Sequence, residues 1–254
     1  MDALFSWVGG KHLLTRQLIP LIPSHKTYIE VFAGAAWMLF RKEKSKVEII
    51  NDLNDQLINL YRCVQNHSDA MMDYLGKIPI SRTEYKRLQR LNPDTLTDIQ
   101  RASRFFYLLR TSYGAKLTHQ TFSLSQTRPS NFNPAKVKAT FGIAAKRLER
   151  VGIENQPYQK IITRYDTPDS FFYIDPPYWG CEHFYGKEFF TRNDFAQLKD
   201  LLMNLQGRFL LSLNDVPEVR ELFQDFNIQT VDTNYSLGGA DKKKRVSELV
   251  IMNY

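Results

Sequence analysis

The chain has 254 residues, of which 43% are hydrophobic and 24% are charged, and its formal net charge is +7. This composition is typical of a folded globular protein and excludes an intrinsically disordered one. No apolar run approaches the roughly 20 residues that span a bilayer, and no secretory signal pattern is visible. Cys63 and Cys181 are too few for a disulfide framework and lack metal-type spacing, so we expect a cytoplasmic protein without a metal site.

The positive charge is concentrated in the middle of the chain. Residues 82–150 contain 14 Lys and Arg against four Asp and Glu, a balance of +10, so the remaining residues sum to −3. A basic segment inside a slightly acidic body predicts contact with a polyanion such as nucleic acid. The alternative is a set of solvated helix faces, although faces of that kind usually mix both signs.

The first part of the chain predicts a βαβ unit. Its expected elements are a turn at 5–11, a short helix stopped by Pro20, a buried strand at 27–32, a small-residue turn at 33–36 that opens a helix to about 44, and a strand at 46–51. Asp52 follows the second strand and lies 18 residues beyond Gly34. This is the spacing at which an acid meets ribose hydroxyls in nucleotide-binding folds.

From residue 55 to about residue 150 the strand signals nearly vanish, and apolar residues keep helical spacing. Ser81 and Glu84 form a capping box, and Asn133-Pro134 begins another helix that we expect to end at Gly152. Residues 113–133 are polar, aromatic and irregular. We therefore predict a helical insertion over residues 55–155.

Strand signals return in the last part of the chain. The expected elements are strands at 160–163 and 171–174, a candidate lid at 179–190, a helix at 193–205 closed by Gly207, a strand at 208–213, a helix at 217–223, a strand at 227–231, a Gly-rich loop at 235–245 and a strand at 247–252. Strands and helices mixed in this way predict an α/β fold.

Residues 170–178, Ser-Phe-Phe-Tyr-Ile-Asp-Pro-Pro-Tyr, are the stretch around which the chain is organised. Four apolar residues followed by an acid and two prolines predict a buried strand that stops abruptly. Asp175 and Tyr178 then lie at the carboxyl edge of the sheet, where open α/β sheets place their sites. The Asp175 carboxylate and the Pro176 carbonyl can accept from an amino group, and Tyr178 can stack on a flat ring. A plain proline turn is the alternative.

The tetrapeptide Asp175-Pro176-Pro177-Tyr178 resembles the Asp-Pro-Pro-Tyr motif of amino-group methyltransferases that use S-adenosylmethionine, in particular the Dam-like, alpha-group DNA adenine-N6 methyltransferases. Three further stretches resemble that family in the family's order. They are Trp7-Val8-Gly9-Gly10-Lys11, similar to its N-terminal cofactor motif; Phe32-Ala33-Gly34-Ala35-Ala36, similar to its Phe-x-Gly-x-Gly turn except for Ala36; and Asn51-Asp52, similar to its ribose-binding acid.

The resemblance implies a Rossmann-like methyltransferase domain formed by residues 1–54 and 156–254, with a helical DNA-recognition domain at 55–155 between them. It implies direct in-line transfer of a methyl group from S-adenosylmethionine to the N6 amine of adenine in double-stranded DNA. The target base is flipped out of the duplex, and neither a metal nor a covalent enzyme intermediate is needed. We expect a monomer.

The resemblance also implies a role for individual residues. The expected catalytic residues are Asp175, Pro176, Pro177 and Tyr178. The expected cofactor contacts are Trp7 as a cover, Lys11 at the methionine carboxylate, Phe32 against the sulfonium, Gly34 at a close backbone approach, Asp52 at the ribose, and Asp175. The expected DNA contacts are Lys116, His119, Arg128, Lys242, Lys243, Lys244 and Arg245.

Some alternatives stay open. Family members that read GATC carry an Asn-Gly-Leu-x-Arg run, whereas residues 113–119 read Tyr-Gly-Ala-Lys-Leu-Thr-His and lack that arginine, which argues against GATC. Methyltransferases of RNA or of a protein amide share related motifs but lack a long basic insertion. A DNA-binding module with a decayed site is the alternative from another class. The sequence leaves open a partner nuclease and a host or phage origin.

Overall fold

The structure is a computed structural model that describes residues 1–5, 7, 9–112, 121–124, 127, 130, 132–181, 190–236 and 243–254; for 233–236 and 243–246 it describes the backbone alone. The chain divides into two compact units. One unit contains Met1–Gly10 and Asn54–Asn155, and the other contains Lys11–Leu53 and Gln156–Tyr254. The first ten residues therefore group with the segment that we predicted to be a helical insertion.

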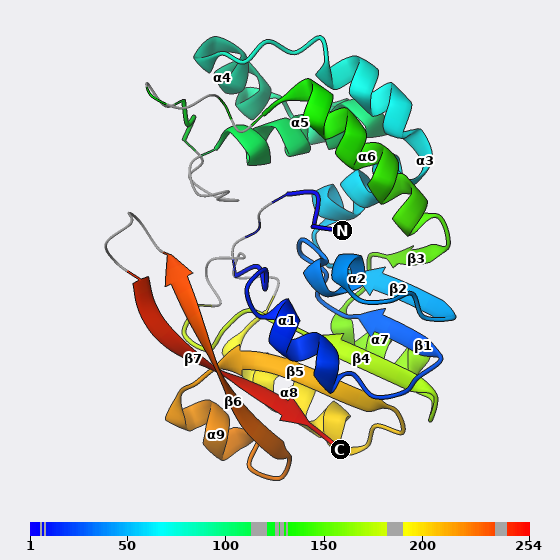
Figure 1. The fold of residues 1–254 in the computed structure, drawn as a ribbon, viewed down its shortest axis with the longest axis vertical. Helices are drawn as coiled ribbons and strands as arrows, with labels where there is room; N and C mark the ends of the chain where they lie inside the picture. The colour runs from blue at the N-terminus through cyan, green and yellow to red at the C-terminus, as the bar shows by residue number, and fades with distance from the viewer. Residues whose placement is uncertain are drawn as a thin grey trace. The chain divides into compact units, whose positions relative to one another are not determined.

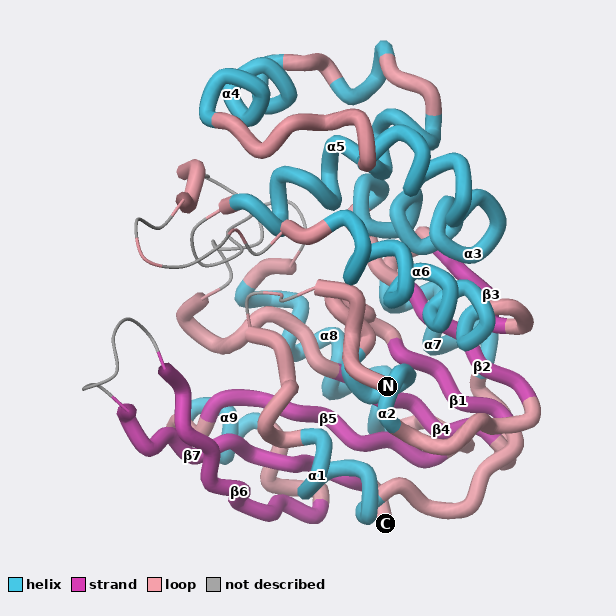
Figure 2. The backbone as a smooth tube through the Cα atoms, turned by 45° about the horizontal axis from the view of Figure 1, so that its top comes forward, coloured by secondary structure: helices cyan, strands magenta, loops and turns pink. Residues whose placement is uncertain are grey.

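The first unit is built mainly from helices (Figure 2). They are α3 (Asp55–Leu75), α4 (Arg82–Arg90), α5 (Asp98–Thr111) and α6 (Pro134–Leu148), with a 3₁₀ turn η2 (Pro93–Thr95) between α4 and α5. Ser81 begins α4 as predicted, because its side chain accepts a hydrogen bond from the Glu84 N–H at 3.0 Å. Buried aromatic rings pack α5 against α6, and the centroids of the Phe106 and Phe141 rings are 4.9 Å apart.

The predicted end of the last helix is wrong. Helix α6 ends at Leu148, and Gly152 lies inside strand β3 (Val151–Glu154). The Gln65 side chain explains the early end, because its amide donates to the carbonyls of Leu148 at 2.7 Å and Val151 at 2.9 Å. It thereby satisfies a terminal helix carbonyl and fixes the turn into the strand.

The sheet has seven strands within the described residues, in the order β3-β2-β1-β4-β5-β7-β6 (Figure 1). The other six strands are β1 (Thr27–Glu30), β2 (Val47–Asn51), β4 (Ser170–Ile174), β5 (Arg208–Asn214), β6 (Asn227–Ser236) and β7 (Lys243–Met252). Strand β1 runs parallel to β2 and β4, β4 runs parallel to β5, and β7 is antiparallel to β5 and β6. The predicted α/β class is confirmed.

Helices cover both faces of this sheet. They are α1 (Thr15–Leu18) with a 3₁₀ turn η1 (Ile19–Leu21), α2 (Trp37–Arg41), α7 (Tyr158–Tyr165), α8 (Arg192–Met203) and α9 (Pro217–Leu222). Strand residues such as Ile29, Phe172 and Leu211 form the apolar core with side chains of α7, α8 and α9. Figure 1 shows α1 on the other side of the sheet, and on that side Leu39 of α2 donates its N–H to Glu30 at 3.0 Å.

The strand predicted at residues 160–163 is wrong, because these residues lie in helix α7. Ile161 and Ile162 are β-branched and favour a strand locally. Together with Tyr158, however, they are buried at helical spacing on one side of α7, so packing overrides the local preference.

Several predicted boundaries also move. Pro20 lies inside η1 and does not end the helix cleanly, and α2 ends at Arg41 rather than near residue 44. Residues 243–245 belong to β7 and not to a loop, because the β6–β7 ladder continues to the pair Ser236↔Lys243. In the described ranges, no helix has both the length and the apolar character to cross a membrane.

Candidate active site

Asp175 lies directly after the last residue of β4, at the carboxyl end of a central parallel strand. The strand ends here because Pro176 and Pro177 have no N–H for the ladder. In the register, Tyr173 of β4 pairs with Glu30 of β1, so both side chains point to the same face of the sheet. Asp175 is two residues further along β4, so the alternation of the strand directs its carboxylate to this face as well.

Lys11 is the cation of this site, and its side chain is only 2% exposed. Its Nζ lies 2.9 Å from Asp175 Oδ1 and 3.1 Å from Glu248 Oε2. It also donates a hydrogen bond to the Tyr178 hydroxyl and lies 4.3 Å from the centroid of that ring. A buried ammonium is tolerated because acceptors surround it. Three residues of the predicted site, Lys11, Asp175 and Tyr178, are thus in contact, and Glu248 joins them.

The surroundings of Asp175 tune its charge. Burial raises the pKa of the Asp175 carboxyl to about 6; the Lys11 cation opposes that rise in pKa and the Glu248 carboxylate adds to it. At pH 7 and above, Asp175 is therefore mainly an ionised carboxylate, which accepts hydrogen bonds and donates none.

The backbone after the motif is held by Asn214 at the end of β5. The Trp179 N–H donates to Asn214 Oδ1 at 2.9 Å, and Asn214 Nδ2 donates back to the Trp179 carbonyl at 3.1 Å. Gly180 follows with a φ of 83°, a left-handed conformation that suits glycine. Sequence reasoning missed Asn214. The available signal was an amide side chain directly after a predicted buried strand.

The turn after β1 brings Gly34 and Asp52 together, as predicted. The Gly34 N–H donates to Asp52 Oδ2 at 3.0 Å, and Gly34 has a φ of 47°. Ala36 stands where the family motif has its last glycine, and it too is left-handed, with a φ of 51°. A side chain in this conformation costs on the order of 1 kcal/mol. The backbone of the motif is therefore kept despite the alanine.

A pocket of about 230 Å³ opens beside this turn, and its lining comprises Val31, Phe32, Asn51, Leu53, Gln156, Pro157, Tyr158, Gln159 and Asp194. The Phe32 ring forms one wall, with its centroid 5.7 Å from that of Tyr158. Asn51 ties the walls together, because its side chain donates to the Gln156 carbonyl at 3.0 Å. Sequence reasoning missed Gln156 and Tyr158, which both precede the segment 160–163 that was misread as a strand.

The described structure does not test the roles of the remaining predicted residues. Trp7 packs within the first unit, with its ring 5.8 Å from that of Phe5 and 6.3 Å from that of Phe105. Lys116, His119, Arg128 and Lys242 lie outside the described residues, as does most of the candidate lid. The backbone of Lys243, Lys244 and Arg245 lies in β7, and their side chains are not described. All of these roles stay predictions.

A mostly parallel α/β sheet with an Asp-Pro-Pro-Tyr turn at the carboxyl end of a central strand is typical of the amino-group methyltransferases that the sequence resembles. Residues 7–237 match the family model described as D12 class N6 adenine-specific DNA methyltransferase. The chain therefore belongs to this family, and it is an adenine-specific DNA methyltransferase. The family match decides against the RNA and protein-amide alternatives.

Relatives match along nearly the whole chain. The Type II methyltransferase M1.LlaDCHI of Lactococcus lactis subsp. cremoris is 24% identical over 98% of this chain and 94% of its own. The Type II methyltransferase M.CviBI of Paramecium bursaria Chlorella virus NC1A is 23% identical over 100% of both chains. The DNA adenine methylase of Escherichia coli (strain K12) is 24% identical over 98% of this chain and 94% of its own.

Proposed function

We propose that this enzyme transfers the methyl group of S-adenosylmethionine to the N6 amine of adenine in double-stranded DNA, with Asp175 at the reacting amine. The observation that carries the proposal is the Asp175 carboxylate, held 2.9 Å from the Lys11 ammonium at the carboxyl end of a central strand. Residues 1–54 and 156–254 would form the Rossmann-like methyltransferase domain, and residues 55–155 the DNA-recognition domain. A chain with only two cysteines favours a reducing cytoplasm. A monomer suffices, because the proposed site needs no second copy.

The residues around the pocket suit the cofactor. Phe32, Leu53 and Tyr158 offer apolar walls to a flat adenine ring, and Asp52, between the lining residues Asn51 and Leu53, can accept from ribose hydroxyls. When bound, S-adenosylmethionine supplies an activated methyl group on a sulfonium. Lys11 is held by Asp175 and Glu248, so we assign it to the catalytic carboxylate and no longer to the methionine carboxylate.

The motif residues orient the target amine. The Asp175 carboxylate and the Pro176 carbonyl accept its two hydrogens, and the Tyr178 ring stacks on the base. An adenine amine is a poor nucleophile because its lone pair is delocalised, and two acceptors held in place draw the nitrogen toward a tetrahedral geometry. The nitrogen loses one proton when it gains the methyl group. The Asp175 carboxylate can take up this proton and pass it to water, since its pKa is about 6.

Methyl transfer to duplex DNA tests the proposal directly. We expect wild-type protein to label adenine and Asp175→Asn to lose about 100- to 1000-fold in rate, because a preorganised acceptor is removed. Cofactor binding by calorimetry should survive in this variant. The matched control is Asp169→Asn, because the Asp169 carboxylate is 56% exposed and pairs with Lys26. Near-normal activity of Asp175→Asn, or a wild-type protein without activity, would contradict the proposal.

Asp52→Ala tests the cofactor side separately. A ribose that loses a charged acceptor should bind more weakly by about 1.5–3 kcal/mol, whereas the rate at saturating cofactor should change less. Unchanged affinity in a titration would mean that Asp52 does not contact the cofactor.

The basic residues are proposed to contact DNA in two ways. Lys243→Ala and Lys244→Ala should weaken binding to all duplexes alike and lower the salt slope by about 1 for each phosphate that the variant no longer neutralises. Arg128, Lys242 and Arg245 belong to the same proposal. Changes at Lys116 or His119 should instead relax discrimination at one base position by roughly 1–3 kcal/mol. Binding of matched and mismatched duplexes across a salt series separates the two patterns.

A further inference from the structure

Glu248 is a second buried carboxylate at the site, and it has no role in the proposed binding of cofactor and adenine. It lies in β7 directly before the apolar residues 249–252 and is 0% exposed. In the antiparallel register it is opposite Asn214 of β5, so it reaches the face of the sheet that carries Asp175. Its Oε2 accepts from the Ser212 hydroxyl at 3.0 Å and lies 3.1 Å from Lys11 Nζ. Burial of a carboxylate is costly unless such partners are present.

We propose that Glu248 is a positioning residue for methyl transfer, which holds the Lys11 ammonium between two carboxylates so that Asp175 keeps an oxygen directed at the adenine amine. This inference rests on the proposed function, because it assigns Asp175 to that amine. Glu248 itself does not touch the base and acts through Lys11.

The geometry brings Lys11 into contact with three acceptors on two structural elements, the turn after β4 and strand β7. An ammonium has three donors, and here it meets Asp175 after β4, Glu248 on β7 and the Tyr178 hydroxyl in the motif turn. Each partner limits how far the ammonium can move toward the others. Without the Glu248 carboxylate, the cation is drawn fully onto Asp175. The paired carboxylate then becomes a weaker acceptor for the amine.

The charges that face Asp175 make this role measurable. They come from Lys11 before α1 and from Glu248 on β7, while Tyr178 adds a neutral hydroxyl and Glu30 on β1, whose pKa burial raises to about 8, is mainly protonated in the range of the test. The Lys11 cation lowers the pKa of Asp175 and the Glu248 carboxylate raises it. Removal of Glu248's charge should therefore lower the pKa of Asp175, and removal of Lys11's charge should raise it.

The test is the pH dependence of the methyl-transfer rate on duplex DNA at saturating cofactor. In wild type, the rate should fall as the pH drops through about 6, where Asp175 becomes protonated. We call this fall in rate at low pH the acidic limb of the profile and the constant rate above it the plateau rate. In Glu248→Gln the midpoint of the acidic limb should move about one pH unit lower, and the plateau rate should fall roughly tenfold. In Lys11→Met the limb should move to higher pH. The matched control, Glu218→Gln, removes an exposed acid on α9 and should leave the limb in place.

A purely structural role would lower the amount of active enzyme without moving the limb. An unmoved limb in folded Glu248→Gln therefore overturns the inference, even if the plateau rate falls. Should Glu248→Gln fail to fold, Ser212→Ala gives a second test, because it keeps both carboxylates and removes one donor to Glu248. Its plateau rate per molecule of folded, cofactor-binding enzyme should fall roughly fivefold with the limb unmoved, whereas a purely structural role would leave this rate per molecule at the wild-type value and would overturn the inference.

The two proposals fail differently in this experiment. A wild-type enzyme that transfers no methyl group to adenine removes the proposed function and this inference with it. An active wild-type enzyme, with Asp175→Asn inactive and Glu248→Gln unchanged in its pH profile, removes the inference alone.

Discussion

The face of the sheet that α7, α8 and α9 cover is apolar, whereas the opposite face carries buried acids and tyrosines. Phe172, Ile174 and Leu211 point to the first face, and each is 0% exposed. Their strand neighbours on the second face include Tyr173 and Asp175. Both faces are shielded from water, so burial alone does not distinguish them. On the apolar face, burial of the side chains itself stabilises the fold. On the polar face, burial of acids and hydroxyls costs free energy, which their hydrogen-bond and ion-pair partners must offset.

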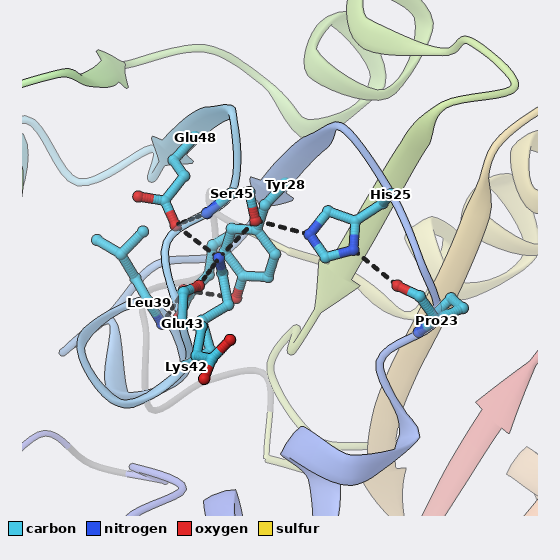
Figure 3. Close-up of polar contacts among 9 residues, drawn as sticks. Pro23, His25, Tyr28, Leu39, Lys42, Glu43, Ser45 and Glu48 are labelled. Carbon is cyan, nitrogen blue, oxygen red and sulfur yellow. Dashed lines mark hydrogen bonds and ion pairs between the residues drawn. The ribbon is translucent and has the colours of Figure 1, made fainter.

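Three strands each place a glutamate on this second face. Glu30, Glu48 and Glu248 are 2%, 6% and 0% exposed. Each has a defined set of partners: Glu30 accepts from the Tyr28 hydroxyl at 2.9 Å, and Glu48 pairs with Lys42 (Figure 3). Polar groups held in this way do not reorganise when charge develops, and this is the environment that Asp175 needs. The apolar face supplies stability, and the polar face supplies fixed charges.

The largest expected effect is on the apolar face. Phe172→Ala removes a fully buried ring from the core and should lower the free energy of unfolding by about 3–5 kcal/mol. Val47→Ala is the matched control on β2, where the side chain is 46% exposed, and it should change stability by only about 0.5 kcal/mol. Urea denaturation of both variants checks this. Equal losses would show that burial in the sheet is not what stabilises the fold.

On the polar face, a single change should be nearly as damaging as the loss of a core ring. Figure 3 shows Lys42 beside Glu48, and its Nζ also donates to Ser45 Oγ at 2.8 Å. Lys42→Met leaves the Glu48 carboxylate buried without its cation and should cost about 3–4 kcal/mol of unfolding free energy. The double variant with Glu48→Leu should recover most of this loss. A double variant as unstable as the single one would mean that the packing of Lys42 matters and its charge does not.

Glu30 gives the polar face a pH dependence. Burial raises the pKa of Glu30 to about 8, so its carboxyl is mainly protonated at pH 7 in the folded protein. The unfolded chain releases this proton near pH 4.5. The contribution of Glu30 to the free energy of unfolding is therefore fully present below pH 4.5 and is lost as the pH rises toward 8. Between pH 5 and pH 7 the loss from this group should be on the order of 2 kcal/mol.

Glu30→Gln should flatten this dependence, since the amide does not titrate. Urea denaturation of wild type and variant at pH 5, 6 and 7 measures the difference. Parallel curves for the two proteins would contradict the proposed protonation of Glu30.

Local sequence signals predicted the features that local chemistry determines. Prolines after an apolar run placed Asp175 at the end of β4, and small residues after β1 placed Gly34 in a tight turn. Glu248, one of the partners of Lys11, could not be found in this way. Glu248 reaches Lys11 only because β7 pairs antiparallel with β5, and no neighbouring residue specifies that pairing.

A usable signal was nevertheless present in the sequence. Glu30 and Glu48 each lie between two apolar residues of a predicted strand, and Glu248 lies in a predicted strand directly before four apolar residues. An acid at such a position means either that the strand is predicted at the wrong place or that the carboxylate is buried and has partners. The misread segment at 160–163 shows the opposite case, because Ile161 and Ile162 gave a strong strand signal that helical packing overrode.

The smallest expected effect is a difference in stability between two variants that each lose one buried hydrogen bond. The acceptor of one bond is a carboxyl group that titrates, and the acceptor of the other is a carbonyl that does not. Tyr28→Phe removes the donor to Glu30, and Tyr107→Phe removes a donor to the Pro79 carbonyl at 3.0 Å. Each change should cost about 1 kcal/mol near neutral pH. The Tyr28 hydrogen bond lowers the pKa of Glu30, so its loss pushes that pKa above about 8.

The two variants should therefore respond differently to alkali. Above pH 8 the ionised Glu30 of wild type depends on the Tyr28 hydroxyl, so the cost of Tyr28→Phe should grow as the pH rises from 7 to 9. The cost of Tyr107→Phe should stay constant over this range, because a carbonyl does not titrate. Unfolding free energies at pH 7, 8 and 9 decide the matter. A constant difference for Tyr28→Phe would mean that the polar face holds Glu30 without regulating its charge.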